Sequence, residues 1–250
     1  MHARLLVLFL PMLVMYARAM STRSLAPKSF LALDFDGVIC ASSSESSVTA
    51  LIAAEEHWGR QIMECNDVEA AEVTAALVKL RPIIETGYEN MLLARLLLEE
   101  YRKYKKLDVG MLSSGWGSAL RDDLLSKYSS KSDVLIQAFG DSRDRLIQKD
   151  IKKWVGLNPI FPFIKDFLAN KSLNTPSCSI ITTKQARFVE TILKSNNIQP
   201  PSRESLFDLE NPFGNKVNVL KELLRRNSAN GDDSLINSLT QSLSKLLYHS

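Results

Sequence analysis

The sequence predicts an α/β fold in which a helical region interrupts the sheet. Residues 30–33 form a short apolar run that ends in Asp34, and Gly37 follows, as expected for a buried strand that stops in a tight turn. A second apolar run, residues 178–181, ends in a threonine. The chain between the two runs is too long for one strand-helix-strand crossover and for a structureless loop.

That intervening chain has apolar residues at helical spacing and few strand-forming runs, as in the leucine-rich segment 91–98. We therefore predict a helical subdomain over residues 47–154, inserted between the two parts of the core, residues 30–46 and 155–226. Glycines mark the expected breaks between its helices. These glycines are Gly87, Gly110, Gly115, Gly117 and Gly140.

Asp34 and Asp36 are the first candidate site residues. Side chains alternate along a strand, so both carboxylates point to one side. Two close carboxylates repel each other unless a cation or a shared proton lies between them, which indicates a hard metal such as Mg²⁺. A calcium loop would need an oxygen ligand and a glycine where the chain has Val38 and Ile39, so that alternative fails. An ordinary strand-to-turn junction remains the competing interpretation.

Residues 34–38, Asp-Phe-Asp-Gly-Val, resemble motif I of the haloacid dehalogenase-like hydrolases. The resemblance implies that Asp34 is the nucleophile, that Asp36 is the general acid/base, and that both take part in a Mg²⁺ site. Within the family, an acidic residue at the position of Asp36 accompanies phosphoryl chemistry rather than dehalogenation. The resemblance therefore implies a phosphatase or, less often, a phosphomutase.

Two further motifs fit in order, and the resemblance covers roughly residues 28–226. Residues 178–184 resemble motif II at Thr182, with Thr183 implied as a substrate-binding residue. Lys216, at the start of an expected helix, resembles the motif III lysine. A hydroxyl, an ammonium and a metal cation complement the charge that phosphoryl transfer places on the phosphate oxygens.

The family's architecture is a Rossmann-like parallel sheet with an inserted all-helical cap that closes over the site and selects the substrate. By resemblance, the strand that precedes Asp34 is flanked on one side by the strand of motif II and on the other by the strand of motif IV, which completes the metal site. This chain departs from that pattern after Arg226. Residues 227–250 begin with a polar, turn-forming stretch, and Asp232 and Asp233 imitate motif IV without a strand before them. We expect the last core strands to be missing and the Asp34 strand to have an open edge.

Residues 1–29 resemble an addition to the domain. They contain no acidic residue and several basic ones, which is typical of a targeting peptide. The apolar stretch 5–16 is interrupted by Pro11 and is shorter than the ~20 residues of a stable membrane span. Residues 17–19, Ala-Arg-Ala, resemble a cleavage site. A secretory signal and a transit peptide for a chloroplast or mitochondrion remain open, as does a cytoplasmic chain that begins at Met20; residues 1–19 are expected outside the fold.

The length and composition of the chain agree with one compact, enzyme-like domain. The chain has 250 residues, 45% of them hydrophobic, and a net charge of +3. No basic stripe with interleaved aromatic residues indicates nucleic-acid binding. The three cysteines are odd in number and widely spaced, which argues against disulfides and zinc.

Two functions follow as hypotheses. The first is a Mg²⁺-dependent hydrolase of a small phosphorylated metabolite that works through an aspartyl-phosphate. The alternative is a truncated, weakly active or inactive protein of the same type that acts as a binding or regulatory product. Four arginines of the insertion are candidates for binding a remote anionic group of a substrate. They are Arg81, Arg95, Arg143 and Arg145, and the competing interpretation is a solvated helix face.

Overall fold

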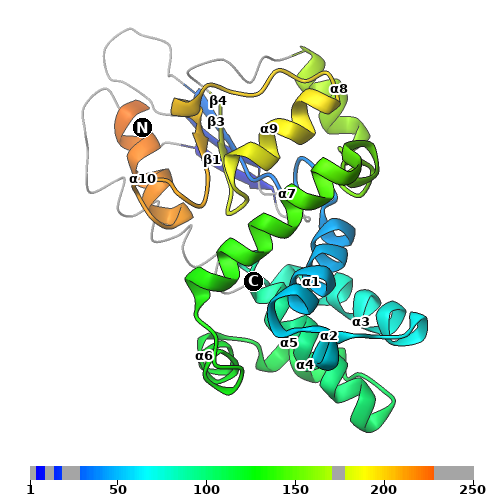
Figure 1. Cartoon of the computed structure of the whole chain (residues 1–250). Helices are drawn as coiled ribbons and strands as arrows, with labels where there is room; N and C mark the ends of the chain where they lie inside the picture. The colour runs from blue at the N-terminus through cyan, green and yellow to red at the C-terminus, as the bar shows by residue number, and fades with distance from the viewer. Residues whose placement is uncertain (1–3, 9–13, 19–28, 171–177, 228–250) are drawn as a thin grey trace, which may run out of the picture. The chain divides into compact units, whose positions relative to one another are not determined.

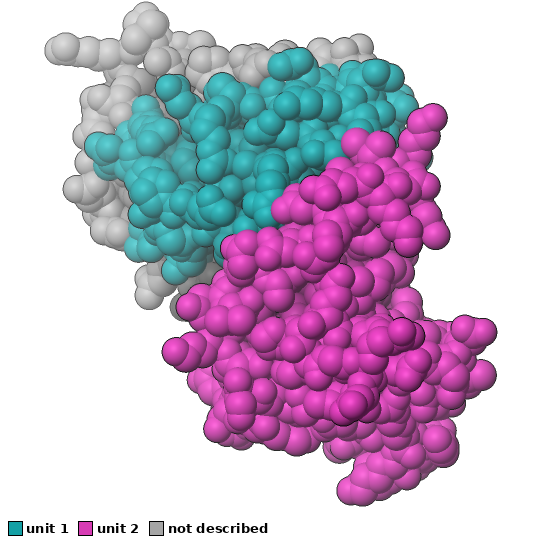
Figure 2. All heavy atoms as spheres, in the orientation of Figure 1, with its two compact units in different colours: residues 1–40, 160–250 teal, residues 41–159 magenta. Residues whose placement is uncertain are grey.

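The computed structural model describes residues 4–8, 14–18, 29–170 and 178–227 (Figure 1). The chain divides into two compact units, which Figure 2 shows in different colours. Unit 1 comprises residues 1–40 and 160–250, and unit 2 comprises residues 41–159. Among the described helices, none is long and apolar enough to cross a membrane. The fold is α/β with a large helical content, as the sequence predicts at this level.

Unit 1 contains a small parallel sheet made of the two predicted strands and a third. Leu33 lies opposite Ile180, and Ile180 lies opposite Leu206. The elements are β3 (Ser29–Leu33), α8 (Pro162–Asn170), β4 (Cys178–Ile181), α9 (Ala186–Ser195), the 3-10 helix η2 (Arg203–Ser205), β5 (Leu206–Phe207) and α10 (Lys216–Asn227). Figure 1 shows α8 and α9 on one side of the strands and α10 on the other.

The burial pattern explains these elements. β4 is buried along its whole length, as expected of a central parallel strand, which reads as a continuous apolar run. Each of the two long helices beside it buries one apolar face at helical spacing. In α9 this face is Phe188, Val189, Ile192 and Leu193, and in α10 it is Val219, Leu220, Leu223 and Leu224.

The other edge of β3 is paired rather than open. β1 (Arg4–Leu8) and β2 (Val14–Arg18) are antiparallel, and β2 pairs antiparallel with β3 so that the sheet order is β1-β2-β3-β4-β5. This pairing departs from the expectation that residues 1–19 stand outside the fold and that β3 has an open edge. The physical reason is that a strand edge presents unpaired backbone groups, which any extended segment within reach can satisfy.

Unit 2 is helical throughout its described elements and lies in the chain between β3 and β4. Its bounds, residues 41–159, enclose the predicted insertion, residues 47–154. The elements are α1 (Ser43–Trp58), α2 (Arg60–Met63), α3 (Asp67–Leu80), the 3-10 helix η1 (Arg81–Ile83), α4 (Glu89–Tyr104), α5 (Val109–Gly115), α6 (Ser118–Lys127) and α7 (Ser132–Gly156).

The prediction that glycines mark the breaks between helices is confirmed at three of the five positions. Gly87 precedes α4, Gly115 ends α5 and Gly117 precedes α6. The predictions for Gly110 and Gly140 are wrong, because both lie inside helices. Glycine lowers helix propensity by only ~1 kcal/mol, which tertiary packing can override, and Gly140 is buried.

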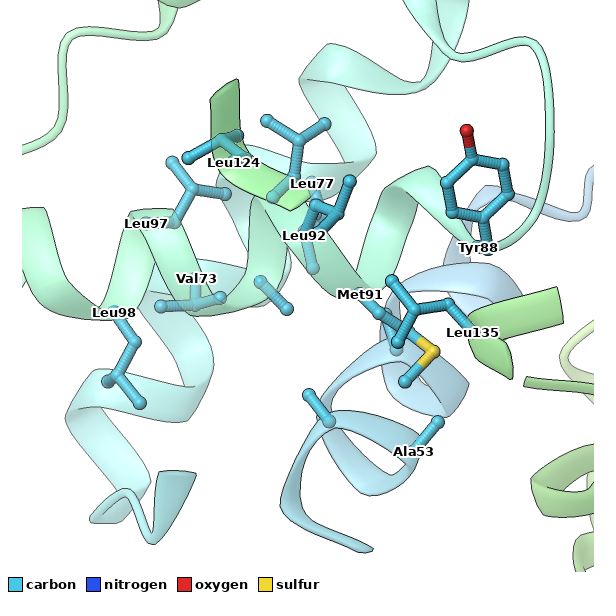
Figure 3. Packing of buried hydrophobic residues seen from close by; sticks show 14 of the residues in the cluster. Ala53, Val73, Leu77, Tyr88, Met91, Leu92, Leu97, Leu98, Leu124 and Leu135 are labelled. Atoms are coloured by element: carbon cyan, nitrogen blue, oxygen red, sulfur yellow. The ribbon is translucent and has the colours of Figure 1, made fainter. Parts of the chain in front are cut away.

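The core of unit 2 surrounds α4. This helix packs against α1, α3 and α6 and buries a nearly continuous apolar stretch from Met91 to Leu98. Figure 3 shows Leu92 and Leu97 of α4 close to Leu77 of α3 and Leu124 of α6. Contact on several sides accounts for the leucine-rich segment, since a helix that is apolar over most of its surface must be covered on more than one face.

Candidate functional site

The site lies within unit 1, at the ends of β3 and β4. β3 ends at Leu33, and the chain turns directly after Asp34. The backbone N–H of Phe35 donates to Oδ1 of Asp34 at 2.7 Å. The N–H of Gly37 donates to the Cys40 carbonyl at 2.8 Å, and Gly37 has a φ of 77°, which a side chain would disfavour. The predicted tight turn is therefore present.

Side chains in this turn alternate as the sequence predicts. Phe35 is fully buried, whereas Asp34 and Asp36 on either side of it are half-buried. The aromatic ring therefore anchors the turn in the core, and the two carboxylates remain partly accessible.

Asp34 contacts Lys216. The ammonium of Lys216, the first residue of α10, forms an ion pair with Oδ2 of Asp34. The two residues come from distant parts of the chain, and each belongs to a different predicted motif. The structure brings the predicted nucleophile and the predicted lysine together.

Asp36 contacts a lysine that sequence reasoning missed. The ammonium of Lys184 lies 3.4 Å from Oδ1 of Asp36, and the Lys184 side chain is fully buried. Lys184 lies two residues after Thr182, directly beyond a buried strand. That position, a cation just after an apolar run, is the signal that could have identified it.

Thr182 follows β4 at the same edge of the sheet as Asp34. Leu33 is opposite Ile180, so both chains leave the sheet side by side at their carboxyl ends, where open α/β sheets bind ligands. Thr182 is buried, and its Oγ1 accepts a hydrogen bond from the N–H of Lys184 at 3.0 Å. Thr183, the predicted substrate-binding residue, is half-buried beside it.

The charges at the site come in opposite pairs. Asp34 is paired with Lys216 and Asp36 with Lys184, so the two carboxylates that would otherwise repel each other are each neutralised. The contact with Lys216 orients the Asp34 carboxylate. The arrangement also places two ammonium groups where a phosphate could be bound.

The carboxylates at the site are compatible with a Mg²⁺ ion that takes only one or two ligands from the protein. Within the described ranges, no group of three or more His, Cys, Asp or Glu residues is positioned to hold a metal. Mg²⁺ usually keeps several waters and uses one or two carboxylates together with substrate phosphate, which Asp34 and Asp36 can supply. Asp232 and Asp233, the residues that imitate motif IV, lie outside the described residues.

The four candidate arginines of unit 2 have partners within that unit. The guanidinium of Arg81 donates to the Ile84 carbonyl at 3.0 Å, and Arg95 pairs with Glu99. In the other two pairs, Arg143 contacts Glu45 and Arg145 contacts Glu56. The contacts of Arg143 are those of a structural residue, because its side chain is buried in a bidentate ion pair.

The cysteines show no sign of a shared site. Cys40 and Cys178 are buried and unoxidised, and Cys65 is half-buried, with a pKa that burial raises.

Comparison of the chain with protein-family models, curated proteins and solved structures finds no match. Function is therefore inferred from the motif residues and their contacts.

Proposed function

We propose that the protein is a Mg²⁺-dependent phosphate-ester hydrolase of the haloacid dehalogenase-like type, with Asp34 as its nucleophile. The observation that carries this proposal is the ion pair between Asp34 and Lys216. These residues belong to separate motifs, and their contact joins the start of the core to its last described helix. An accidental motif match gives no reason for the two side chains to meet.

The roles follow from the chemistry of the groups. The Asp34 carboxylate attacks the phosphorus atom, an acyl-phosphate forms, and the bond to the ester oxygen breaks. Asp36, in its protonated form at this step, gives its proton to that leaving oxygen. Asp36 then accepts a proton from the water that attacks the acyl-phosphate, and inorganic phosphate leaves as the Asp34 carboxylate is restored. Mg²⁺, when bound by the carboxylates, supplies positive charge that offsets the charge of the phosphoryl group.

The remaining residues orient the nucleophile and offset the charge of the phosphate. Lys216 holds the Asp34 carboxylate, and Thr182 offers a hydroxyl at the edge where the phosphate would lie. Unit 1 then corresponds to the Rossmann-like core, and unit 2 to the helical cap that selects a small phosphorylated metabolite.

A second candidate function is binding without turnover. This candidate is favoured by the small number of acidic ligands: within the described residues, Asp34 and Asp36 are not joined by a third metal-binding side chain. A weakly held metal would leave phosphoryl transfer slow while phosphate binding persists.

The test uses the full chain and an aryl phosphate with Mg²⁺. Asp34→Asn should abolish hydrolysis, since the amide keeps the shape but loses the nucleophilic charge. Asp36→Asn should reduce it about 10²–10⁴-fold, the usual effect of losing general acid/base help. Asp166→Asn, at an exposed position in α8, is the matched control and should have no effect.

Most of the activity surviving in Asp34→Asn would contradict the assignment. Wild-type protein that binds inorganic phosphate but hydrolyses no ester would favour the second candidate.

A further inference from the structure

The segment from Thr182 to Ala186, which follows β4 and carries its site residues, is held at both ends by β5 and the residue directly after it. The N–H of Thr182 donates to the Phe207 carbonyl at 2.8 Å. The N–H of Ala186 donates to Oδ2 of Asp208, also at 2.8 Å. Phe207 and Asp208 are adjacent at the end of β5, so the two hydrogen bonds act as a clamp on the segment.

Asp208 replaces a missing helix cap. Gln185 occupies the N-cap position of α9, yet its side chain makes no capping hydrogen bond. A carboxylate is favourable at a helix N-terminus because it accepts from an unpaired N–H and faces the positive end of the helix dipole. Asp208 supplies this group from the position directly after β5.

Asp208 is itself fixed in place. It is 2% exposed. Its Oδ1 accepts from Nη2 of Arg203 at 3.2 Å and from the N–H of Glu210 at 3.3 Å. A buried carboxylate with donors on both oxygens has little freedom to reorient.

We infer that Asp208 is a positioning residue that sets the place of Lys184 against Asp36 by clamping the Thr182–Ala186 segment. Lys184 lies between the two anchors, its N–H is bonded to Thr182, and its ammonium lies 3.4 Å from Asp36. Release of the Ala186 end allows this turn to move and carries the ammonium away from the proposed acid/base. The catalytic consequence rests on the proposed function, whereas the clamp itself does not.

The kinetic test compares Asp208→Ala with two other variants. In Asp208→Ala, kcat for an aryl phosphate should fall about 10²-fold, the typical effect of a ~1 Å displacement, while KM changes little. Asp208→Asn keeps an oxygen acceptor and should recover most of kcat. Arg203→Gln removes an exposed partner of Asp208 but leaves the N–H of Glu210 on Oδ1 and the N–H of Ala186 on Oδ2, and should behave as wild type.

Ala186→Pro cuts the same hydrogen bond from its other end. Proline suits the first position of a helix, where its missing N–H is normally unneeded, and Gln185 already has the extended backbone that precedes proline, with φ −59° and ψ 139°. This variant should lose kcat as Asp208→Ala does. It also covers the case in which Asp208→Ala fails to fold.

A measurement that does not depend on turnover tests the clamp by Asp208 separately from the proposed hydrolase function. In NMR spectra, the Ala186 amide should be protected from exchange in wild type and Asp208→Asn and unprotected in Asp208→Ala, and the Lys184 amide resonance should shift. Unchanged kcat in Asp208→Ala and Ala186→Pro, with an active wild type, would overturn the inference and leave the proposed function intact. If wild type hydrolyses no ester, the proposed function fails; weaker binding of inorganic phosphate by Asp208→Ala then supports the clamp, and unchanged binding overturns it.

Discussion

The ammonium of Lys184 lies 3.4 Å from Oδ1 of Asp36, and it ties the turn after β3 to the turn after β4. The Lys184 side chain has no exposed surface, whereas the Asp36 side chain is 12% exposed. A fully buried ammonium is stable only beside an opposite charge and hydrogen-bond acceptors. The pair therefore couples local stability to the geometry of the proposed acid/base.

Breaking this pair should destabilise unit 1. For Lys184→Met we expect a loss of about 3 kcal/mol in the free energy of unfolding, at the lower end for buried pairs because Asp36 keeps some contact with solvent. Lys194→Met, which removes an exposed pair with Glu190, is the matched control and should cost less than ~1 kcal/mol. Hydrogen exchange of the Ile180 backbone amide in β4 measures the loss of stability in both variants. Equal effects would contradict a structural role for the Lys184 pair.

A second buried pair should stabilise unit 2. Two nitrogens of Arg143 donate to the two carboxylate oxygens of Glu45, each at 2.8 Å, and Nε1 of Trp154 donates to the same carboxylate at 3.3 Å. Arg143→Met leaves a buried carboxylate without its cation, so we expect a loss of about 3–5 kcal/mol. Arg145→Met breaks a half-exposed pair with Glu56 and should cost under ~1 kcal/mol.

Tryptophan fluorescence measures this effect selectively, because the three tryptophans of the chain, Trp58, Trp116 and Trp154, all lie in unit 2. Similar losses in Arg143→Met and Arg145→Met would show that burial of the first pair has no energetic consequence.

The stability of unit 2 should decrease in mild acid. Burial, and then the nearby charge of Arg95, lowers the pKa of His57 from its ordinary value of 6.5. The folded state therefore binds a proton on His57 less readily than the unfolded chain does. The free energy of unfolding falls as the pH drops below about 6.5 and is unaffected by His57 well above it.

The variant His57→Gln tests this dependence, since glutamine can still bond to Ser130, whose Oγ lies 3.3 Å from Nε2 of His57, but cannot take up a proton. Unfolding of unit 2 in urea, followed by tryptophan fluorescence from about pH 7.5 to about pH 5.5, should depend less on pH in the variant. Identical pH profiles for variant and wild type would exclude His57 as the cause.

Removal of residues 1–19 should expose the edge of β3. A chain that begins at Met20 lacks β2, the strand that pairs with β3 from Val14 to Arg18. Unpaired backbone groups along a buried apolar strand favour association between copies. We expect lower thermal stability and concentration-dependent oligomers by light scattering. A monodisperse chain with unchanged unfolding would instead place residues 1–19 outside the fold, as their charge pattern suggests, and mass spectrometry of the native N-terminus would then test cleavage.

Much of the local structure of the core follows from adjacent residues. Apolar runs end in polar turn residues at Asp34 and Thr182, and this pattern is enough to predict β3 and β4. Alternation along a strand separates Phe35 from its two aspartate neighbours. The length and periodicity of the chain between the strands require a helical insertion. Such features depend on backbone geometry and burial within a few residues, so a single sequence records them.

Long-range contacts were decided by the tertiary structure. Lys184 and Lys216 are both lysines beside apolar segments, and only the packing of β3 against β4 and α10 assigns each to its aspartate. The role of Asp208 depends on β5 lying beside β4, and Arg143 differs from Arg145 only in which side of α7 is buried. The sequence by itself determined which residues carry the charges. Their partners depend on which segments the core brings together, because the energy of an ion pair or hydrogen bond is set by distance and burial rather than by separation along the chain.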